Sequence, residues 1–172
     1  ALQRWYEAPT LRRLGGTLPA GSRVVEVGCG AGYGTSLILD YFGARHVDAV
    51  DLDQQMVAKA RRRLRHHGNR VRLTVGDATD LRAVFGAGEA AYDAAFDFAI
   101  VHHIEDWRAA LAEIARVLRP GGIFYFDEVT AHALARPRYR ALFDHPEPDR
   151  FTAEQFLDAP PRHADRRLDH PN

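Results

Sequence analysis

The feature that most constrains this 172-residue chain is the stretch 24–35, where a run of valines leads into alternating glycines. The three valines of residues 24–27 are β-branched and apolar, which predicts a short buried strand. The glycines that follow are Gly28, Gly30, Gly32 and Gly34. Backbone this rich in glycine can turn sharply and approach a ligand closely. Residues 35–39 then predict the start of a helix, and strand, glycine turn and helix together are typical of a nucleotide-binding α/β domain.

The spacing of the glycines separates two classes of nucleotide-binding domain. A dinucleotide fingerprint, G-x-G-x-x-G, would place its third glycine at position 33, which is Tyr33. This disfavours an NAD-type oxidoreductase. The pattern present is E-x-G-x-G-x-G, from Glu26 to Gly32, and it resembles the first signature of class I S-adenosylmethionine (SAM)-dependent methyltransferases.

Strand and helix patterns alternate through the rest of the chain, which predicts a parallel sheet with right-handed crossovers. The further strands are expected at 46–51, 70–77, 92–97 and 123–128, the helices at 54–67, 105–118 and 130–143, and a short helix followed by a loop over 79–90. Each of these strands ends in an acid: Asp51, Asp77, Asp97 and the pair Asp127 and Glu128. Because the carboxyl ends of parallel strands share one edge of the sheet, we expect these acids and the glycine turn to line one ligand site.

The resemblance to class I SAM-dependent methyltransferases of the small-molecule type extends over residues 24–34, 47–53, 75–80, 92–107 and 115–128. It implies a Rossmann-like, doubly wound α/β fold with strand order 3-2-1-4-5, SAM as cofactor, S-adenosylhomocysteine (SAH) as product, and a small molecule as methyl acceptor. The cofactor-binding positions that it implies are Glu26, Gly28, Cys29, Gly30, Asp51, Leu52, Asp77, Ala78 and Asp97. Asp51 would accept from the ribose hydroxyls, Leu52 would pack on adenine, and Asp77 would accept from the adenine amine.

Methyl transfer is a displacement at a carbon already activated by the sulfonium, so the protein mainly supplies alignment and a dry pocket. An acceptor hydroxyl must also lose its proton, and the candidates near the methyl group are Asp97, His102 and His103. A histidine titrates near neutral pH and suits the role of base. The alternative is that the histidine pair only fixes the loop. We expect no metal ligand set, and the lone Cys29 reads as a small filler of the turn rather than a nucleophile.

The C-terminal part departs from the family pattern. The antiparallel hairpin of strands six and seven is missing, and residues 151–157 predict only a short capped helix. We expect a SAM-binding domain over 1–144, with residues 1–20 as a helical cover or lid, and an irregular tail over 145–172. The exposed edge of the fifth strand would favour a homodimer. The lost hairpin leaves an alternative open: a truncated SAM- or SAH-binding protein without methyltransferase activity.

Composition narrows the expected partners. Lys plus Arg and Asp plus Glu both number 23, so the formal net charge is zero, which gives no indication of a nucleic-acid or membrane partner. The basic run 61–65 has helical spacing and is expected to be a solvated face. The single cysteine excludes an internal disulfide and fits a cytoplasmic protein.

Overall fold

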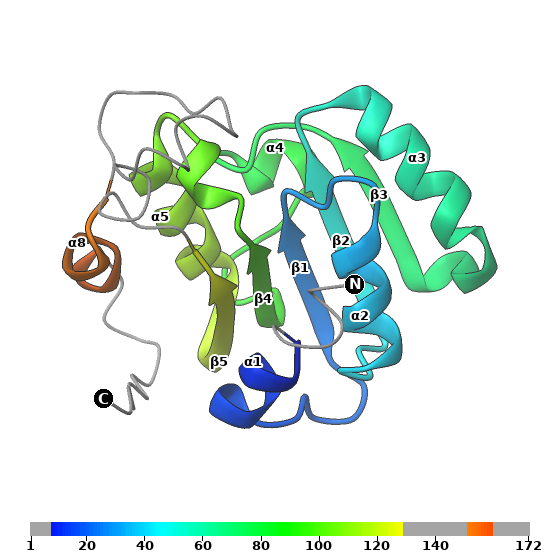
Figure 1. Ribbon diagram of the computed structural model, residues 1–172, viewed down its shortest axis with the longest axis horizontal. Helices are drawn as coiled ribbons and strands as arrows, with labels where there is room; N and C mark the ends of the chain where they lie inside the picture. The colour runs from blue at the N-terminus through cyan, green and yellow to red at the C-terminus, as the bar shows by residue number, and fades with distance from the viewer. Residues whose placement is uncertain (1–7, 129–150, 160–172) are drawn as a thin grey trace, which may run out of the picture.

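The computed structural model describes residues 8–128 and 151–159, and its centre is a five-stranded sheet in the order β3-β2-β1-β4-β5 (Figure 1). Every neighbouring pair of strands is parallel. The strands are β1 (Arg23–Val27), β2 (His46–Asp51), β3 (Val71–Val75), β4 (Tyr92–Phe98) and β5 (Leu118–Asp127). The Rossmann-like fold class and the strand order expected from the sequence are therefore confirmed.

Helices cover both faces of the sheet, because side chains of each strand alternate between two core clusters. The α-helices are α1 (Ala8–Gly15), α2 (Tyr33–Asp40), α3 (Gln54–Leu64), α4 (Leu81–Phe85), α5 (Trp107–Val117) and α8 (Ala153–Asp158), and the 3-10 helices are η2 (Arg65–Arg70) and η3 (Val101–His103). In β1, Val24 packs in the cluster with α1 and α2, whereas Val25 and Val27 pack in the cluster with α4, α5 and α8.

Several element boundaries differ from those expected, and three of them lie beside a glycine. Helix α2 begins at Tyr33, two residues early, because Gly32 takes a left-handed conformation as its N-cap. The α-helical part of 54–67 ends at Leu64 and passes into η2, where Gly68 breaks the helical geometry. Strand β5 begins at Leu118 rather than Ile123, with a register shift opposite β4 between Tyr92 and Ala94 that accommodates the Pro-Gly-Gly sequence.

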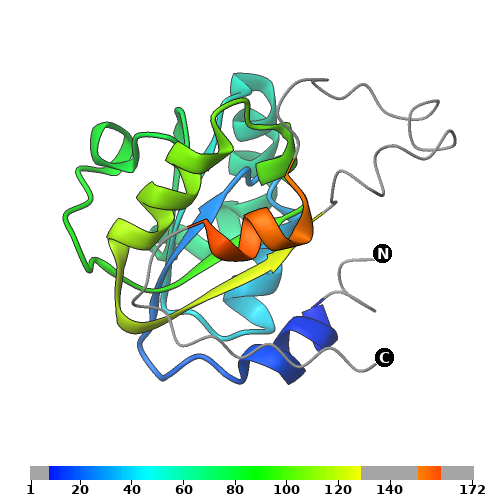
Figure 2. The ribbon, with the colours of Figure 1, turned by 90° about the vertical axis from the view of Figure 1, so that its left-hand side faces the viewer.

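The segment 151–159 joins the core of the domain. Helix α8 is capped reciprocally by Thr152 and Gln155, which confirms the capped helix expected there. Phe151 stacks edge-on against Trp107 of α5, and Phe156 contacts Phe126 of β5. Helix α8 therefore lies against β5 and α5 (Figure 2). The helix expected at 130–143 and the tail from 160 onward lie outside the described residues.

Helix α1 packs on the same face of the sheet as α2. At its end, the hydroxyl of Tyr125 in β5 donates to the carbonyls of Gly15 and Gly16. Residues 1–7 lie outside the described part, so a lid formed by residues 1–20 stays a prediction. Within the ranges 8–128 and 151–159, the sheet ends at β5 without an antiparallel partner. In those same ranges, none of the helices has the length and apolar character that a membrane span requires.

Candidate functional site

The glycine turn connects β1 to α2 and owes its path to left-handed backbone at Gly28 and Gly30, with φ of 68° and 50°. A Cβ on Gly28 would stand 2.1 Å from the side chain of Ile100, so a larger residue does not fit there. Arg63 of α3 holds the far end of the turn. Its Nε donates to the carbonyl of Ala31 at 2.8 Å, and its guanidinium lies over the Tyr33 ring. From the sequence pattern, Arg63 is expected only on the solvated face of α3, and the pattern gives no sign of these two contacts.

Asp51 ties the glycine turn to the end of β2. Its Oδ2 accepts from the Gly30 amide at 2.7 Å, and its Oδ1 accepts from the Asp53 amide at 2.9 Å. The Cys29 amide donates to the Val50 carbonyl, and the Gly76 amide donates to the Asp51 carbonyl. Hydrogen bonds thus connect the segments at the carboxyl ends of β1, β2 and β3, which lie along one edge of the sheet. We call the edge formed by the C-terminal ends of the five strands the carboxyl edge.

The other expected cofactor contacts also lie at the carboxyl edge. Leu52 is 75% exposed, which leaves its side chain available to a planar ring. Asp77 is exposed and accepts from the Thr79 amide at 2.9 Å, while Ala78 is buried beneath it. Cys29 is buried, and burial raises the pKa of its thiol, as fits a filler rather than a nucleophile.

Glu26 is a carboxyl group buried beside the glycine turn, with 1% of its surface exposed. Its Oε2 accepts from the hydroxyl of Thr35 in α2. Burial raises the pKa of Glu26 to about 8, because the Thr35 hydrogen bond offsets only part of the desolvation and the charge of Asp51 adds to it. The ligand-free protein therefore holds this carboxyl mostly neutral at pH 7.

A second acidic centre forms where β4 and β5 end. Asp97 is fully buried, and its Oδ1 accepts from the Ile100 amide at 2.9 Å. Burial and the neighbouring Glu128 carboxyl raise the pKa of Asp97 well above its usual range. Glu128 in turn accepts from the Val101 amide at 2.6 Å and pairs through Oε2 with Nδ1 of His102 at 2.7 Å. Two carboxyls and an imidazole thus form one buried chain of contacts.

The three catalytic candidates differ in burial and in their contacts. Asp97 and His102 are both buried and both contact Glu128, whereas His103 is exposed and stacks on the His102 ring at 4.2 Å. Glu128 was expected only as an acid at a strand end. Its link to His102 depends on the register of β4 against β5, which places Phe98 opposite Asp127, and the sequence pattern does not contain that register.

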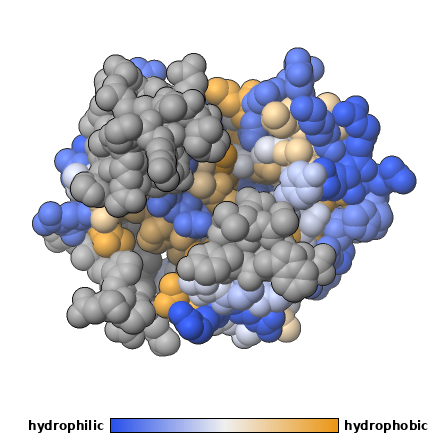
Figure 3. All heavy atoms as spheres, in the orientation of Figure 1, coloured by the Kyte–Doolittle hydropathy of each residue, from blue (hydrophilic) through white to orange (hydrophobic). Residues whose placement is uncertain are grey.

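The surface over α3 is hydrophilic (Figure 3), and its arginines at 61–63 and 65 are exposed. This agrees with the solvated face expected for the basic run.

Comparisons with known proteins agree with this geometry. A family model described as a methyltransferase domain matches residues 24–122, which is more than half of the chain. A fatty-acid O-methyltransferase from Mycolicibacterium smegmatis is 36% identical over 132 residues, covering 73% of this chain and 44% of that protein. A SAM-dependent Diels-Alderase, iccD, from Talaromyces variabilis is 37% identical over 112 residues, covering 65% of this chain and 38% of that protein.

The fold has solved counterparts. The structure of phosphoethanolamine N-methyltransferase 2 from Haemonchus contortus in complex with SAM matches with a TM-score of 0.66 at 26% identity, covering 80% of this chain and 31% of that one. The chain thus spans less than half the length of these relatives. The matched domain, the strand order and the glycine turn lead to one conclusion: this chain belongs to the class I SAM-dependent methyltransferases, the family whose cofactor is SAM.

Proposed function

We propose that this chain binds SAM at the carboxyl edge and transfers its methyl group to a small-molecule acceptor. The observation that carries the proposal is the bonding of the glycine turn to Asp51, which puts flexible backbone and a carboxylate on one surface. Membership of the methyltransferase family supports it, and so does the fatty-acid acceptor in the name of the mycobacterial relative.

In this proposal the cofactor lies along the carboxyl edge. The backbone at Gly28 and Gly30 contacts its methionine and ribose part, with Cys29 filling the turn, and Glu26 meets the amino-acid end. Asp51 accepts from both ribose hydroxyls, a two-point contact that a carboxylate makes well. Leu52 packs on the adenine face. The Asp77 carboxylate and the Ala78 amide would bind the edge of the adenine ring.

Proton removal from the acceptor falls to His102, with Asp97 lining the same site. The carboxyl of Glu128, 2.7 Å from His102 Nδ1, fixes the orientation of the imidazole, so Glu128 is a positioning residue. As the acceptor atom bonds to the methyl carbon, the carbon–sulfur bond breaks with its electrons going to sulfur, and the acceptor proton passes to His102. His103, which is exposed, serves as the matched control.

Turnover of methyl-labelled SAM with a panel of carboxylic acids, phenols and amines tests the proposal, with calorimetric titration of SAM alongside. We expect SAM binding and labelled product. His102→Asn should lower kcat at least tenfold with SAM affinity unchanged, whereas His103→Asn should leave kcat within about twofold. Glu128→Gln should shift the pH profile of kcat. Binding of NAD without binding of SAM would end the proposal, and equal effects of the two histidine variants would remove His102 as the base.

The second candidate is a protein that binds SAM or SAH without methyl transfer. It is favoured by the name of the Diels-Alderase relative, a SAM-dependent protein whose named activity is not methyl transfer. Tight SAM binding with no labelled product from any acceptor would favour this candidate.

We also propose that the chain forms a homodimer through the unpaired edge of β5. Ile123 and Phe124 of β5 are only partly buried, and within the described residues no further strand pairs with β5. A second copy of the chain would cover this edge in a homodimer. Sedimentation velocity at micromolar concentration tests this, and a monomer throughout would contradict it. We expect the protein in the cytoplasm, where the single Cys29 stays reduced, and without nucleic-acid or membrane partners.

A further inference from the structure

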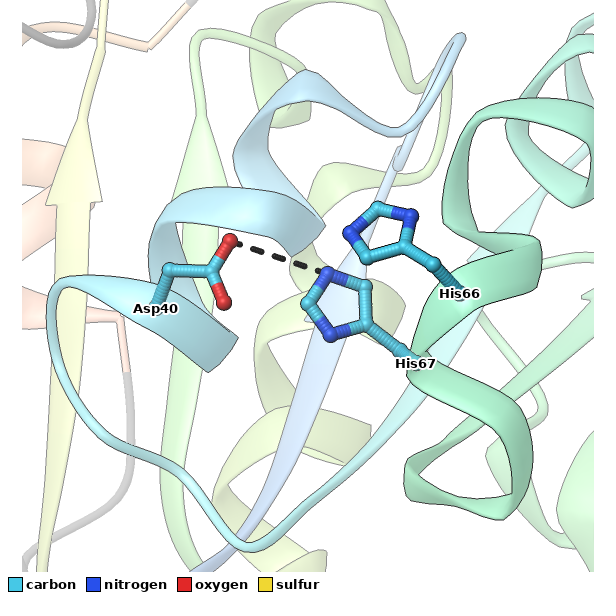
Figure 4. Close-up of side chains that lie close together, drawn as sticks. All are labelled: Asp40, His66 and His67. Carbon is cyan, nitrogen blue, oxygen red and sulfur yellow. Dashed lines mark ion pairs between the residues drawn. The ribbon is translucent and has the colours of Figure 1, made fainter.

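We propose that Asp40, His66 and His67 form a binding site for a divalent transition-metal ion, with Zn²⁺ as the ion of best fit. Asp40 is the last residue of α2, and the two histidines belong to η2. The Asp40 carboxylate and both imidazole rings point toward one another (Figure 4). One ligand atom from each residue lies within 4.8 Å of the other two. No residue of the proposed cofactor or acceptor site takes part, so this is a separate site.

The separation between the His67 and Asp40 ligand atoms is close to the distance between two ligands of one zinc ion. His67 Nε2 lies 3.6 Å from Asp40 Oδ2. Tetrahedral Zn²⁺ with bonds of about 2.0–2.1 Å holds its ligands about 3.4 Å apart. The observed distance is too long for a good hydrogen bond between the two groups. A bound ion would need a contraction of only a few tenths of an ångström at this pair.

His67 Nε2 is a buried polar atom without a hydrogen-bond partner within the described part of the chain. The side chain is 4% exposed, and this nitrogen faces the exposed carboxylate of Asp40. An ion bound between this nitrogen and the Asp40 carboxylate would give the buried atom a partner.

His66 is oriented by a contact of its own. Its Nδ1 lies 3.1 Å from the carbonyl of Arg63, so the tautomer that donates there carries its lone pair on Nε2. Metal-bound histidines are commonly fixed by such a hydrogen bond from the second ring nitrogen. Arg70 donates to the carbonyls of Leu39 and Ala44, on either side of Asp40 in the chain. These hydrogen bonds hold the C-terminal end of α2, which carries the carboxylate, in place.

The three ligand side chains favour some metal ions over others. Two imidazoles and one carboxylate suit Zn²⁺ and related first-row ions rather than Mg²⁺ or Ca²⁺, which prefer oxygen ligands. Asp40 and His66 are exposed, so an ion can enter, and water completes the fourth position. A bound ion would join the C-terminus of α2 to the turn after α3 and so stabilise the fold.

Calorimetric titration of the untagged chain with ZnCl₂ tests the site, with Co²⁺ absorption as a report on geometry. We expect one Zn²⁺ per chain, a higher Tm with Zn²⁺, and the visible bands of tetrahedral Co²⁺. His66→Ala and Asp40→Asn change exposed side chains and should each weaken Zn²⁺ binding at least tenfold and abolish the Co²⁺ bands. His67→Gln should do the same, but this variant alters the core.

His46→Asn is the matched control, because His46 pairs with a carboxylate, Asp48, elsewhere in the fold. It should keep wild-type Zn²⁺ affinity within about twofold. Wild-type affinity in both His66→Ala and Asp40→Asn would overturn the proposal, as would the absence of Zn²⁺ binding by the wild-type chain.

Discussion

Glu26→Gln should make the ligand-free protein more stable at pH 8 than the wild type, while the two differ little at pH 5. The folded wild type holds the Glu26 carboxyl neutral, with its pKa raised from 4.5 to about 8 by burial. The unfolded chain ionises this group above about pH 4.5. Folding must therefore take up a proton at pH 7, and stability is lost as the pH rises from the unfolded toward the folded pKa. Glutamine stays neutral in both states.

The expected change in the free energy of unfolding follows from the shift in the pKa of Glu26. Each pKa unit is worth roughly 1.4 kcal/mol, so the free energy of unfolding of Glu26→Gln relative to wild type should rise by up to about 3.5 kcal/mol between pH 5 and pH 8. Relaxation of the buried site reduces this value. The glutamine carbonyl can still accept from the Thr35 hydroxyl, so the local packing is kept.

Urea unfolding of both proteins at pH 5 and pH 8, followed by circular dichroism, measures the difference. Glu113→Gln is the control, because hydrogen bonds from Arg116 lower the pKa of Glu113. Its ionised form is favoured in the fold, so this variant should be less stable than wild type at both pH values. A difference between Glu26→Gln and wild type that stays constant within about 0.5 kcal/mol would refute the reasoning.

Three further outcomes are expected. Asp51→Asn should weaken SAM binding at least tenfold by calorimetry, a loss of about 1.4 kcal/mol. Asp53→Asn lies two residues away and keeps an N-cap, so it should change SAM affinity less than threefold. Equal losses of affinity in the two variants would contradict the contact between Asp51 and the ribose. Gly28→Ala should cost about 2–4 kcal/mol in urea unfolding, because strain from positive φ adds to overlap with a side chain, while Gly86→Ala, with φ of 67° and open space, should cost about 1 kcal/mol. Phe156→Ala should cost about 3–5 kcal/mol, and a loss below 1 kcal/mol would mean that α8 is not part of the cooperative core.

The sheet and its order could be expected from the sequence because they rest on local patterns. Each strand has an apolar or an alternating polar–apolar pattern, and an acid or the glycine turn lies at or close to its end. The carboxyl edge follows from topology alone, since parallel strands bring their ends together. The bonding of Asp51 to Gly30 agrees with the proximity expected there, but the cofactor contacts themselves stay predictions.

The parts that could not be expected depend on register and on close packing between distant segments. The contact of Glu128 with His102 needs the β4–β5 alignment, and the extension of β5 back to Leu118 needs a shifted register that no periodicity reveals. Asp40 and His67 meet only because η2 turns back onto the end of α2. No local spacing pattern connects these two residues, so their sequence positions do not indicate a metal site.

The neutral Glu26 carboxyl has a consequence for the thermodynamics of ligand capture. An ammonium group arriving beside it would favour the ionised form, so the protein would release a proton to the buffer as the complex forms. The measured heat would then change with the ionisation enthalpy of the buffer, and affinity would strengthen as the pH rises toward 8. The Glu26 carboxyl, uncharged in the ligand-free protein, would thus become a counter-ion only when a cationic ligand binds.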